Sequence, residues 1–363
     1  METTPKASLY PIDAALSKRI DNIRVILTIF IIYIHIYNIN DVSFADGNFQ
    51  MMEQPLWLSV VKQSISLVIA RVGVPLFFLI SSILLYSKPF TFAENMKKKC
   101  RAILIPYLFW NTFWILFFFT AQSISFTQPF FATRIIREYS AFKFFACYIP
   151  IPGVDASPFC YPLWFLFDLF TLNALSKVIK ALADRLPVLF TSACAIAWLF
   201  NLELYIISPE ALMFFLLGYF IVKNRWSIKK IDSLALADLS AAWLLSVFVA
   251  AAFLGTYPIL LKASILIGIL FFIRLSETIA ARKNWLGKLI EFLIPYTFMI
   301  YVSHEFTMTI LKKLVVRLLP QTYAIQLAEY LIIPLVIVVI CTLWGMAFKK
   351  TLPKAYKLFT GNR

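Results

Sequence analysis

Long apolar stretches recur along the whole chain, and they constrain its fold more than any other feature. A helix needs roughly 20 apolar residues to cross the hydrocarbon core of a bilayer, and ten stretches approach that length. They make the chain 61% hydrophobic and 15% charged, whereas soluble domains carry about 25% charged residues. The sequence therefore predicts an all-α polytopic membrane protein, with residues 1–363 forming a single transmembrane domain. The predicted spans are 20–39, 64–86, 102–121, 163–182, 187–207, 209–223, 235–254, 258–275, 290–311 and 329–349.

Charged residues between the apolar stretches predict how the chain is oriented. The net charge is +15, and basic residues cluster in alternate connections such as 87–101, while the connection 40–57 has three acidic residues and no basic one. Because basic loops stay in the cytoplasm, we expect both termini there, as short tails over about 1–19 and 350–363. One basic group, after residue 311, is expected on the opposite face. Since topology accounts for the basic charge, we expect the lipid bilayer as a partner and no nucleic acid.

The longest connection, residues 122–162, is expected on the outer face of the membrane. It contains Cys147 and Cys160, which either form a disulfide or remain two free thiols, and the sequence leaves both possibilities open. Its stretch 135–145 has the pattern of an amphipathic helix that lies along the membrane interface. The five cysteines lack metal-ligand spacing and there are only two histidines, so we expect no bound metal.

Arg24 and His35 interrupt the first apolar stretch, where ionisable side chains are costly and usually face a cavity or a partner. They are eleven residues apart, which is three helical turns plus about 20°, so both side chains point in the same direction. A rise of about 1.5 Å per residue separates them by about 16 Å along the helix axis. This geometry favours a long ligand with an anionic group at Arg24 and a reactive group at His35. The alternatives are that Arg24 snorkels to the headgroups and that His35 is a hydrogen-bonded structural residue.

His304 lies in the ninth predicted span, within the sequence FMIYVSHEF. It is 14 residues from Ile290, and His35 is 15 residues from Ile20, so the two histidines are expected at similar depth. An imidazole gains or loses a proton near neutral pH, and two of them at one depth in an apolar bundle indicate a catalytic chamber. The alternative is that His304 forms a structural hydrogen bond between helices.

Five further residues are candidates for ligand binding. Arg71 and Asp168 lie near the outer ends of the second and fourth predicted spans, where each either serves a site or is hydrated at the interface. Asp168 is suited to orient a histidine or to pair with Arg71. Trp164 is typical of the aromatic belt of membrane proteins. Lys98 and Arg101 are first of all topology determinants, and they are also suited to bind phosphate groups on the cytoplasmic side.

Several segments, taken in order, resemble the acyltransferase-3 family of membrane acyltransferases. Arg24, ten further residues and then His35 resemble the paired motif of that family. The family usually has Ser-Gly where this chain has Ser81-Ser82, a difference expected to affect local packing and not the chemistry. The resemblance covers about residues 18–350. The other matching segments are VPLFFLISSILL (74–85), KKKCRAILIPYLFW (97–110), PLWFLFDLF (162–170), FFLLGYFI (214–221) and FMIYVSHEF (298–306).

The resemblance implies an enzyme that transfers an acyl group, often acetyl from acetyl-CoA, to a hydroxyl group of an envelope glycan or a lipid-linked sugar. It implies a location in the bacterial inner membrane. Because the chain ends soon after the tenth predicted span, we expect a stand-alone O-acetyltransferase without an appended soluble domain. The expected catalytic residues are His35 and His304, the expected coenzyme-binding residues are Arg24, Arg101 and Lys98, and the expected acceptor-binding residues are Arg71, Trp164, Asp168 and Tyr301.

Two other functions remain open on the sequence alone. A transporter or flippase of a lipid-linked glycan would share the ten spans and basic loops and would need no coenzyme. A membrane scaffold for glycan assembly would need neither histidine. The chain has no Gly-rich phosphate loop and only nine Gly, which is few for a transporter with broken helices. We therefore favour the acyltransferase, with His35 acting either as a general base or as the carrier of a covalent acyl group.

Overall fold

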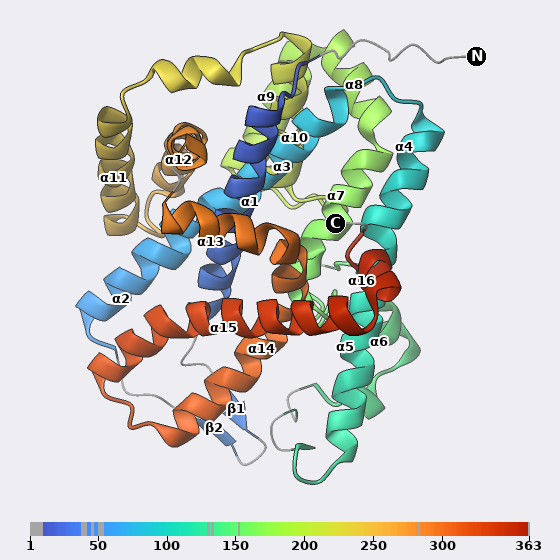
Figure 1. Cartoon of the computed structure of the whole chain (residues 1–363), viewed down its shortest axis with the longest axis vertical. Helices are drawn as coiled ribbons and strands as arrows, with labels where there is room; N and C mark the ends of the chain where they lie inside the picture. The colour runs from blue at the N-terminus through green and yellow to red at the C-terminus, as the bar shows by residue number, and fades with distance from the viewer. Residues whose placement is uncertain are drawn as a thin grey trace. The chain divides into compact units, whose positions relative to one another are not determined.

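The structure of the protein is a computed structural model, and it consists almost entirely of helices (Figure 1). This agrees with the predicted all-α fold. Two short strands, β1 (Val42–Phe44) and β2 (Gly47–Phe49), pair antiparallel, with Ser43 opposite Asn48. The residues that the structure describes are 10–37, 42–44, 47–49, 54–128, 131, 134–151, 153–281 and 284–361.

The chain forms two compact units, and each unit combines segments that are distant in the sequence. Helix α1 (Ala14–Ile36) is continuous, and it contributes residues to both units. The first unit comprises residues 1–30, 68–99 and 168–294, and the second comprises residues 31–67, 100–167 and 295–363.

Helices of the first unit frequently begin at residues suited to a helix start. Pro187 and Pro209 occupy first helical positions, where proline lacks only an amide hydrogen that would be unpaired in any case. The Ser208 side chain accepts a hydrogen bond from the backbone N–H of Ala211 and so caps the helix that follows. After α1, the elements are η2 (Ala70–Val72), α3 (Gly73–Tyr86), α4 (Phe92–Lys99), α7 (Trp164–Ala174, which starts in the second unit), α8 (Ser176–Arg185), α9 (Pro187–Leu199), α10 (Pro209–Lys223), η7 (Ile228–Ser233), α11 (Leu236–Ala252), α12 (Pro258–Ala281) and α13 (Trp285–Leu293).

The contact between α3 and α10 depends on the glycine at position 218. A side-chain carbon on Gly218 would lie 2.6 Å from Cβ of Ser82 and 2.7 Å from the carbonyl oxygen of Leu79. Ser82 is fully buried at this contact, and it is the residue that departs from the Ser-Gly pattern noted above. Because Gly218 has no side chain, α10 leaves room for Ser82 on α3, which is larger than the glycine usual at that position.

Arg19 anchors α1 within the first unit. Its guanidinium donates two hydrogen bonds to the carboxylate of Asp232, both 2.8 Å long. It also donates to the carbonyl oxygen of Ile273 at 2.8 Å and to the hydroxyl of Ser276 at 3.1 Å. Because the Arg19 side chain is almost completely buried, these partners replace the water that its charge would otherwise require.

The second unit carries both histidines of the chain. Its longer helices, α14 and α15, pack against each other (Figure 1). Besides the end of α1 and the two strands, its elements are α2 (Leu56–Gln63), η1 (Ser64–Ile69, which ends in the first unit), η3 (Cys100–Leu104), α5 (Ile105–Ser123), η5 (Ile136–Glu138), α6 (Ala141–Ala146), η6 (Tyr161–Leu163), η8 (Ile294–Tyr296, which starts in the first unit), α14 (Thr297–Leu318), α15 (Tyr323–Thr351) and α16 (Pro353–Phe359).

Aromatic contacts fix α14 against α5 in the second unit. The indole N–H of Trp114 donates to the carbonyl oxygen of Val302 at 3.0 Å. The Trp114 ring also lies 4.2 Å, centroid to centroid, from the ring of Phe306. On the other side, Gly345 of α15 lies close to Met299. These contacts hold the part of α14 that contains His304 in one position.

Several helical stretches of the described residues are long and apolar enough to cross a membrane, as expected for a multi-pass membrane protein. Helices α8 and α9 provide one more if the pair, bent by 119°, is a single span. Ten spans were predicted, and the structure divides the fourth at Leu175 and gives the sixth only 15 residues. The helix α1 contains Arg19, Asp21 and Arg24 in every stretch of span length. The five qualifying stretches are Leu56–Tyr86, Phe92–Ser123, Pro258–Ala281, Trp285–Leu318 and Tyr323–Thr351.

Basic residues assigned to connecting loops by the sequence lie on helices instead. Lys97, Lys98 and Lys99 form the last turn of α4. Likewise, α14 continues to Leu318 and so includes the basic group expected after residue 311. Lysine and arginine are good helix formers, and the C-terminal end of a helix favours cations, so the helices extend past the apolar residues that defined the predicted spans.

The segment 135–145, predicted as one interfacial helix, forms two shorter elements, η5 and the six-residue α6. Helix α6 exposes the side chains of Phe142 and Phe145, as is typical of residues at a membrane interface. Cys147 and Cys160 are buried and present as free thiols in the structure.

Candidate active site

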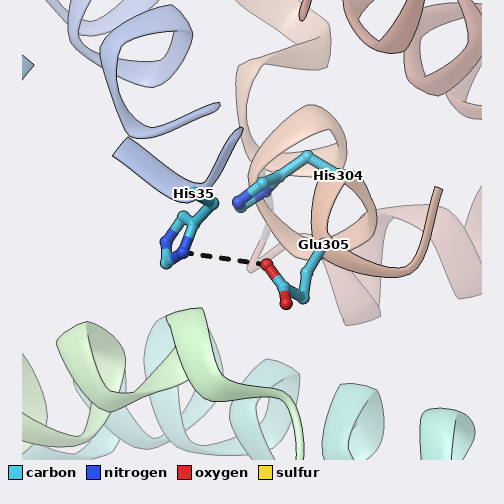
Figure 2. A group of neighbouring side chains, drawn as sticks. All are labelled: His35, His304 and Glu305. Carbon is cyan, nitrogen blue, oxygen red and sulfur yellow. Dashed lines mark ion pairs between the residues drawn. The ribbon is translucent and has the colours of Figure 1, made fainter. Parts of the chain in front are cut away.

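The two histidines come together in the second unit. His35 lies one residue before the end of α1, and His304 lies in the first half of α14. Their ring centroids are 5.3 Å apart. The sequence predicted similar depths for the two residues, and the structure shows that the rings are neighbours (Figure 2).

Glu305 completes the group. Its carboxylate oxygen Oε2 lies 3.7 Å from Nδ1 of His35, the ion pair drawn in Figure 2. A carboxylate at Nδ1 favours the tautomer that carries its proton there, which leaves Nε2 of His35 with a lone pair. The pair is largely withdrawn from solvent, with 15% of the His35 side chain and 23% of the Glu305 side chain exposed. Low polarity strengthens the attraction between the two groups if His35 becomes protonated.

His304 is fully buried, and one of its ring nitrogens is engaged by its own helix. Nδ1 lies 2.7 Å from the carbonyl oxygen of Tyr301, one turn earlier. Since that oxygen can only accept, Nδ1 carries the proton and Nε2 is left as an acceptor. Nε2 has no hydrogen-bond partner among the described residues. A buried nitrogen lone pair without a partner is costly, which is a physical sign of a group reserved for a ligand.

Tyr161 and Tyr301 border the histidines. The Tyr161 ring, from η6, stands edge-on to His35 with centroids 5.9 Å apart. The Tyr301 ring lies 6.3 Å from that of His304, and its hydroxyl donates a hydrogen bond to the carbonyl oxygen of Pro162. Tyr301 therefore ties η6 to α14. The helix places Tyr301, His304 and Glu305 on one side because residues three and four positions apart share a face.

The arrangement can perform proton transfer, and its ligand atoms also lie close enough for metal binding. The His35 imidazole can act as a base, the Glu305 carboxylate can orient it, and the His304 imidazole offers a second nitrogen that accepts hydrogen bonds. This is the pattern of a histidine general base. One ligand atom from each of His35, His304 and Glu305 lies within 4.8 Å of the other two. The sequence predicted no metal, and this group is the place in the described part of the chain where that prediction can be tested.

Most of the sequence matches a known family. The model of an acyltransferase domain matches residues 17–348. The chain belongs to the acyltransferase-3 family. It is also similar to the succinoglycan biosynthesis protein ExoH of Rhizobium meliloti (strain 1021), with 28% identity over 255 residues. That match covers 68% of this chain and 65% of the relative, which is less than two thirds of its length. No solved structure matches the chain.

Arg24 and His35, the pair that resembles the family motif, lie on one unbroken helix but have different surroundings. Arg24 belongs to the first unit, where its guanidinium lies 3.2 Å from the carboxylate of Asp21 on the same helix and its side chain is 38% exposed. Lys98 and Arg101, the other predicted coenzyme-binding residues, are exposed at the end of α4 and in η3. All three present positive charge, and none of them belongs to the group around His35.

The predicted acceptor-binding residues are distributed between the units. Trp164 and Tyr301 belong to the second unit, where Tyr301 borders His304. Arg71 lies half-buried in η2 of the first unit. Asp168 is buried in the first unit, and its carboxylate accepts a hydrogen bond of 2.9 Å from the backbone N–H of Ser208. The carboxylate that faces a histidine is thus Glu305, and Asp168 holds the start of α10.

Sequence reasoning missed Glu305 and Tyr161. Glu305 directly follows His304, and consecutive helical residues point about 100° apart, so the two did not suggest a joint site. The available signal was a carboxylate in the middle of an apolar span, which is rare and usually functional. Tyr161 begins η6, a helical element of only three residues before α7, and so short a stretch has no periodic pattern that predicts which way a side chain points.

Proposed function

We propose that this protein is a membrane O-acyltransferase, which moves an acyl group, acetyl in the first instance, from acyl-CoA to a hydroxyl group of an envelope glycan or lipid-linked sugar. The observation that carries the proposal is the meeting of His35, Glu305 and His304 in one largely buried group within a chain of the acyltransferase-3 family. The similarity to a succinoglycan biosynthesis protein supports a glycan as the acceptor.

In the proposed reaction His35 is the general base. Nε2 of His35 takes the proton of the acceptor hydroxyl while the hydroxyl oxygen forms a bond to the thioester carbonyl carbon. The carbon–sulfur bond then breaks, the leaving thiolate receives the proton from His35, and the products are the ester and free coenzyme A. Glu305 orients the ring and stabilises its protonated form, while Nε2 of His304 accepts a hydrogen bond from a neighbouring hydroxyl of the acceptor sugar.

A covalent route uses the same residues. Nε2 of one histidine attacks the thioester carbon and coenzyme A leaves as its thiolate. The acceptor hydroxyl then displaces the acyl group from the ring, and its proton passes to the other histidine and from there to the thiolate. Acid quenching during turnover followed by mass spectrometry of the His35 and His304 peptides separates the two routes, because only the covalent route leaves an acylated peptide.

The substrates are proposed to approach from opposite faces of the membrane. Arg24, Lys98 and Arg101 supply positive charge for the phosphates of the coenzyme on the cytoplasmic side. Tyr301 and Trp164 contribute to the acceptor side. Arg71 and Asp168 remain predicted acceptor-binding residues. We further propose ten spans in the bacterial inner membrane, with both termini in the cytoplasm; reporter fusions at each end test this orientation.

A direct experiment uses purified protein in lipid nanodiscs. Labelled acetyl-CoA is supplied with envelope glycan from cells that lack the gene, and both coenzyme A release and ester-linked label on the glycan are measured. We expect both products, and we expect a chelator such as EDTA to leave the rate unchanged. Absence of label transfer with every glycan fraction, together with no coenzyme A release, would reject the proposal. Loss of activity on chelation that zinc restores would assign the His35 group to a metal instead.

A lipid-linked glycan transporter is the second candidate. It predicts movement of the glycan across the bilayer of sealed vesicles without coenzyme A and without a change in the mass of the glycan. The same vesicles, supplied with acetyl-CoA on the outside only, distinguish the two functions. An acyltransferase releases coenzyme A and raises the mass of the glycan, whereas a transporter moves the glycan without either change.

A further inference from the structure

A polar cavity lies on the segment that follows α5, in the second unit. Its volume is about 460 Å³, within the roughly 300–1,000 Å³ that is usual for small-molecule sites. It is unusual in this apolar chain because charged and hydroxyl-bearing side chains form nearly all of its wall. The lining residues are Arg134, Ile135, Glu138, Tyr139, Ser140, Lys143 and Asp155.

The charges of the cavity cancel. Arg134 and Lys143 contribute two positive charges, and Glu138 and Asp155 contribute two negative ones. Lys143 is already paired with Asp155, the two charged atoms being 3.6 Å apart. Lining residues with no net charge are expected to bind an anion such as a phosphate weakly, because phosphates bind to clusters of cationic side chains. They do suit a neutral molecule whose groups both donate and accept hydrogen bonds, and each sugar hydroxyl does both.

The Tyr139 hydroxyl is the group of the cavity that most clearly requires a ligand. Its oxygen is buried and has no hydrogen-bond partner among the described residues. Burial raises the pKa of this phenol to about 12, so the hydroxyl keeps its proton at neutral pH and is available as a donor. An unpaired buried hydroxyl costs free energy. A rotation of the Tyr139 side chain that turns the hydroxyl into the cavity would let a hydroxyl-bearing ligand recover that cost.

The cavity is connected to the histidine group through a short series of contacts. One guanidinium N–H of Arg134 donates to the carbonyl oxygen of Phe159 at 2.8 Å, and the guanidinium stands over the Phe159 ring at 5.5 Å. The Phe159 ring stacks on Phe306 with centroids 5.9 Å apart, and Phe306 directly follows Glu305. Binding at both places requires an acceptor of several sugars, with one residue in the cavity and another at His35.

We infer that this cavity is a binding subsite for a neutral sugar residue of the acceptor glycan, next to the residue that receives the acyl group. The inference rests on the acyltransferase function proposed above. It assigns the choice of acceptor to the segment after α5, while the acyl transfer itself stays with His35 and its neighbours.

The test separates acceptor binding from donor chemistry. Tyr139→Phe removes only the hydroxyl, and Glu138→Gln removes only a charge. Tyr205→Phe and Glu203→Gln are matched controls, because both residues are exposed in the segment between α9 and α10 and line no part of the cavity. For each protein in nanodiscs we would measure transfer of labelled acetyl as a function of the concentration of envelope glycan from cells lacking the gene. Acetyl-CoA hydrolysis without glycan is measured in parallel.

We expect Tyr139→Phe to raise the glycan concentration needed for half-maximal transfer about tenfold, the usual effect of one lost hydrogen bond to a buried group. Glu138→Gln should change it in the same direction, while kcat, hydrolysis without glycan and both control variants stay at the wild-type level.

An unchanged KM for the glycan in both cavity variants would overturn the inference and leave the proposed function standing. Loss of hydrolysis together with transfer would overturn it too, because the cavity would then act on the reaction centre. Wild-type protein without any hydrolysis or transfer would reject the proposed function and this inference with it. If Tyr139→Phe does not fold, Glu138→Gln decides alone.

Discussion

The carboxylate of Glu305 lies 3.7 Å from Nδ1 of His35, although 270 positions separate the two residues in the sequence. One comes from the last turn of α1 and the other from the middle of α14. A carboxylate behind an imidazole fixes its tautomer and stabilises its cation, which is how histidine bases are supported in unrelated enzymes. In the proposed reaction, Glu305 acts together with His35 of the Arg24–His35 pair that resembles the family motif.

Replacement of Glu305 by Gln tests that role. The amide keeps the shape of the side chain but cannot stabilise a protonated His35, so we expect kcat for acyl transfer to fall about 10²–10³-fold while KM for acyl-CoA changes little. Glu291→Gln, on the exposed part of α13, is the control and should behave as the wild type. A kcat within a factor of three of the wild-type value would show that Glu305 does not support the base.

The Arg19–Asp232 pair should dominate the local stability of the first unit. Asp232→Asn leaves a buried guanidinium without its counter-charge, and we expect about 2–4 kcal/mol of lost stability. The same substitution at Asp13 breaks an exposed pair with Lys229, and an asparagine there can still cap α1 through its side-chain oxygen, so a much smaller loss is expected. Thermal unfolding in detergent, followed by circular dichroism, compares the two variants. Equal losses would contradict the assignment.

The contact between α3 and α10 predicts a compensating pair of substitutions. Gly218→Ala places a carbon too close to Ser82 and to the Leu79 carbonyl, and we expect a loss of about 1–3 kcal/mol from overpacking. Adding Ser82→Gly, which restores the pattern usual in the family, should recover part of the loss, because the contact with Leu79 remains. A double-mutant cycle on the same unfolding assay measures the coupling, and strictly additive effects would refute it.

The thiol of Cys147 should react slowly in the folded protein. Burial raises its pKa to about 11, so at pH 8 the reactive thiolate is a very small fraction, and it should increase about tenfold per pH unit up to that value. Maleimide labelling of native and denatured protein, read by mass spectrometry, checks this. Labelling as fast in the native as in the denatured state would contradict it. Labelling of Cys147 and Cys160 in denatured, unreduced protein also decides whether the two thiols are free or joined.

The sequence predicted the parts of the site that depend on helical counting. The eleven-residue spacing of Arg24 and His35 needed only an unbroken helix, and α1 is unbroken. The matched depths of His35 and His304 followed from counting residues from the starts of two spans. What counting cannot supply is the rotation of α14 about its own axis, which the packing of Trp114 against Phe306 decides. That rotation turns Glu305 toward His35.

The predicted helix boundaries were wrong for a related reason. Hydropathy marks where apolar residues end, whereas a helix continues as long as its residues favour helical backbone and their polar groups reach water or partners. The last turns of α4 and α14 are therefore basic helices where loops were predicted. No proline or glycine lies at Leu175, where the helix breaks between α7 and α8, and nothing in the local sequence explains the break.

The measurement that tests the central claim most directly is the rate of acyl transfer by His35→Ala. The variant protein is purified, shown to be folded and monodisperse by size-exclusion chromatography, and supplied with labelled acetyl-CoA and envelope glycan from cells that lack the gene. Loss of the base should reduce transfer by at least about 10²–10⁴-fold, with no ester-linked label above background. Transfer within a few-fold of the wild-type rate by this folded variant would contradict the account.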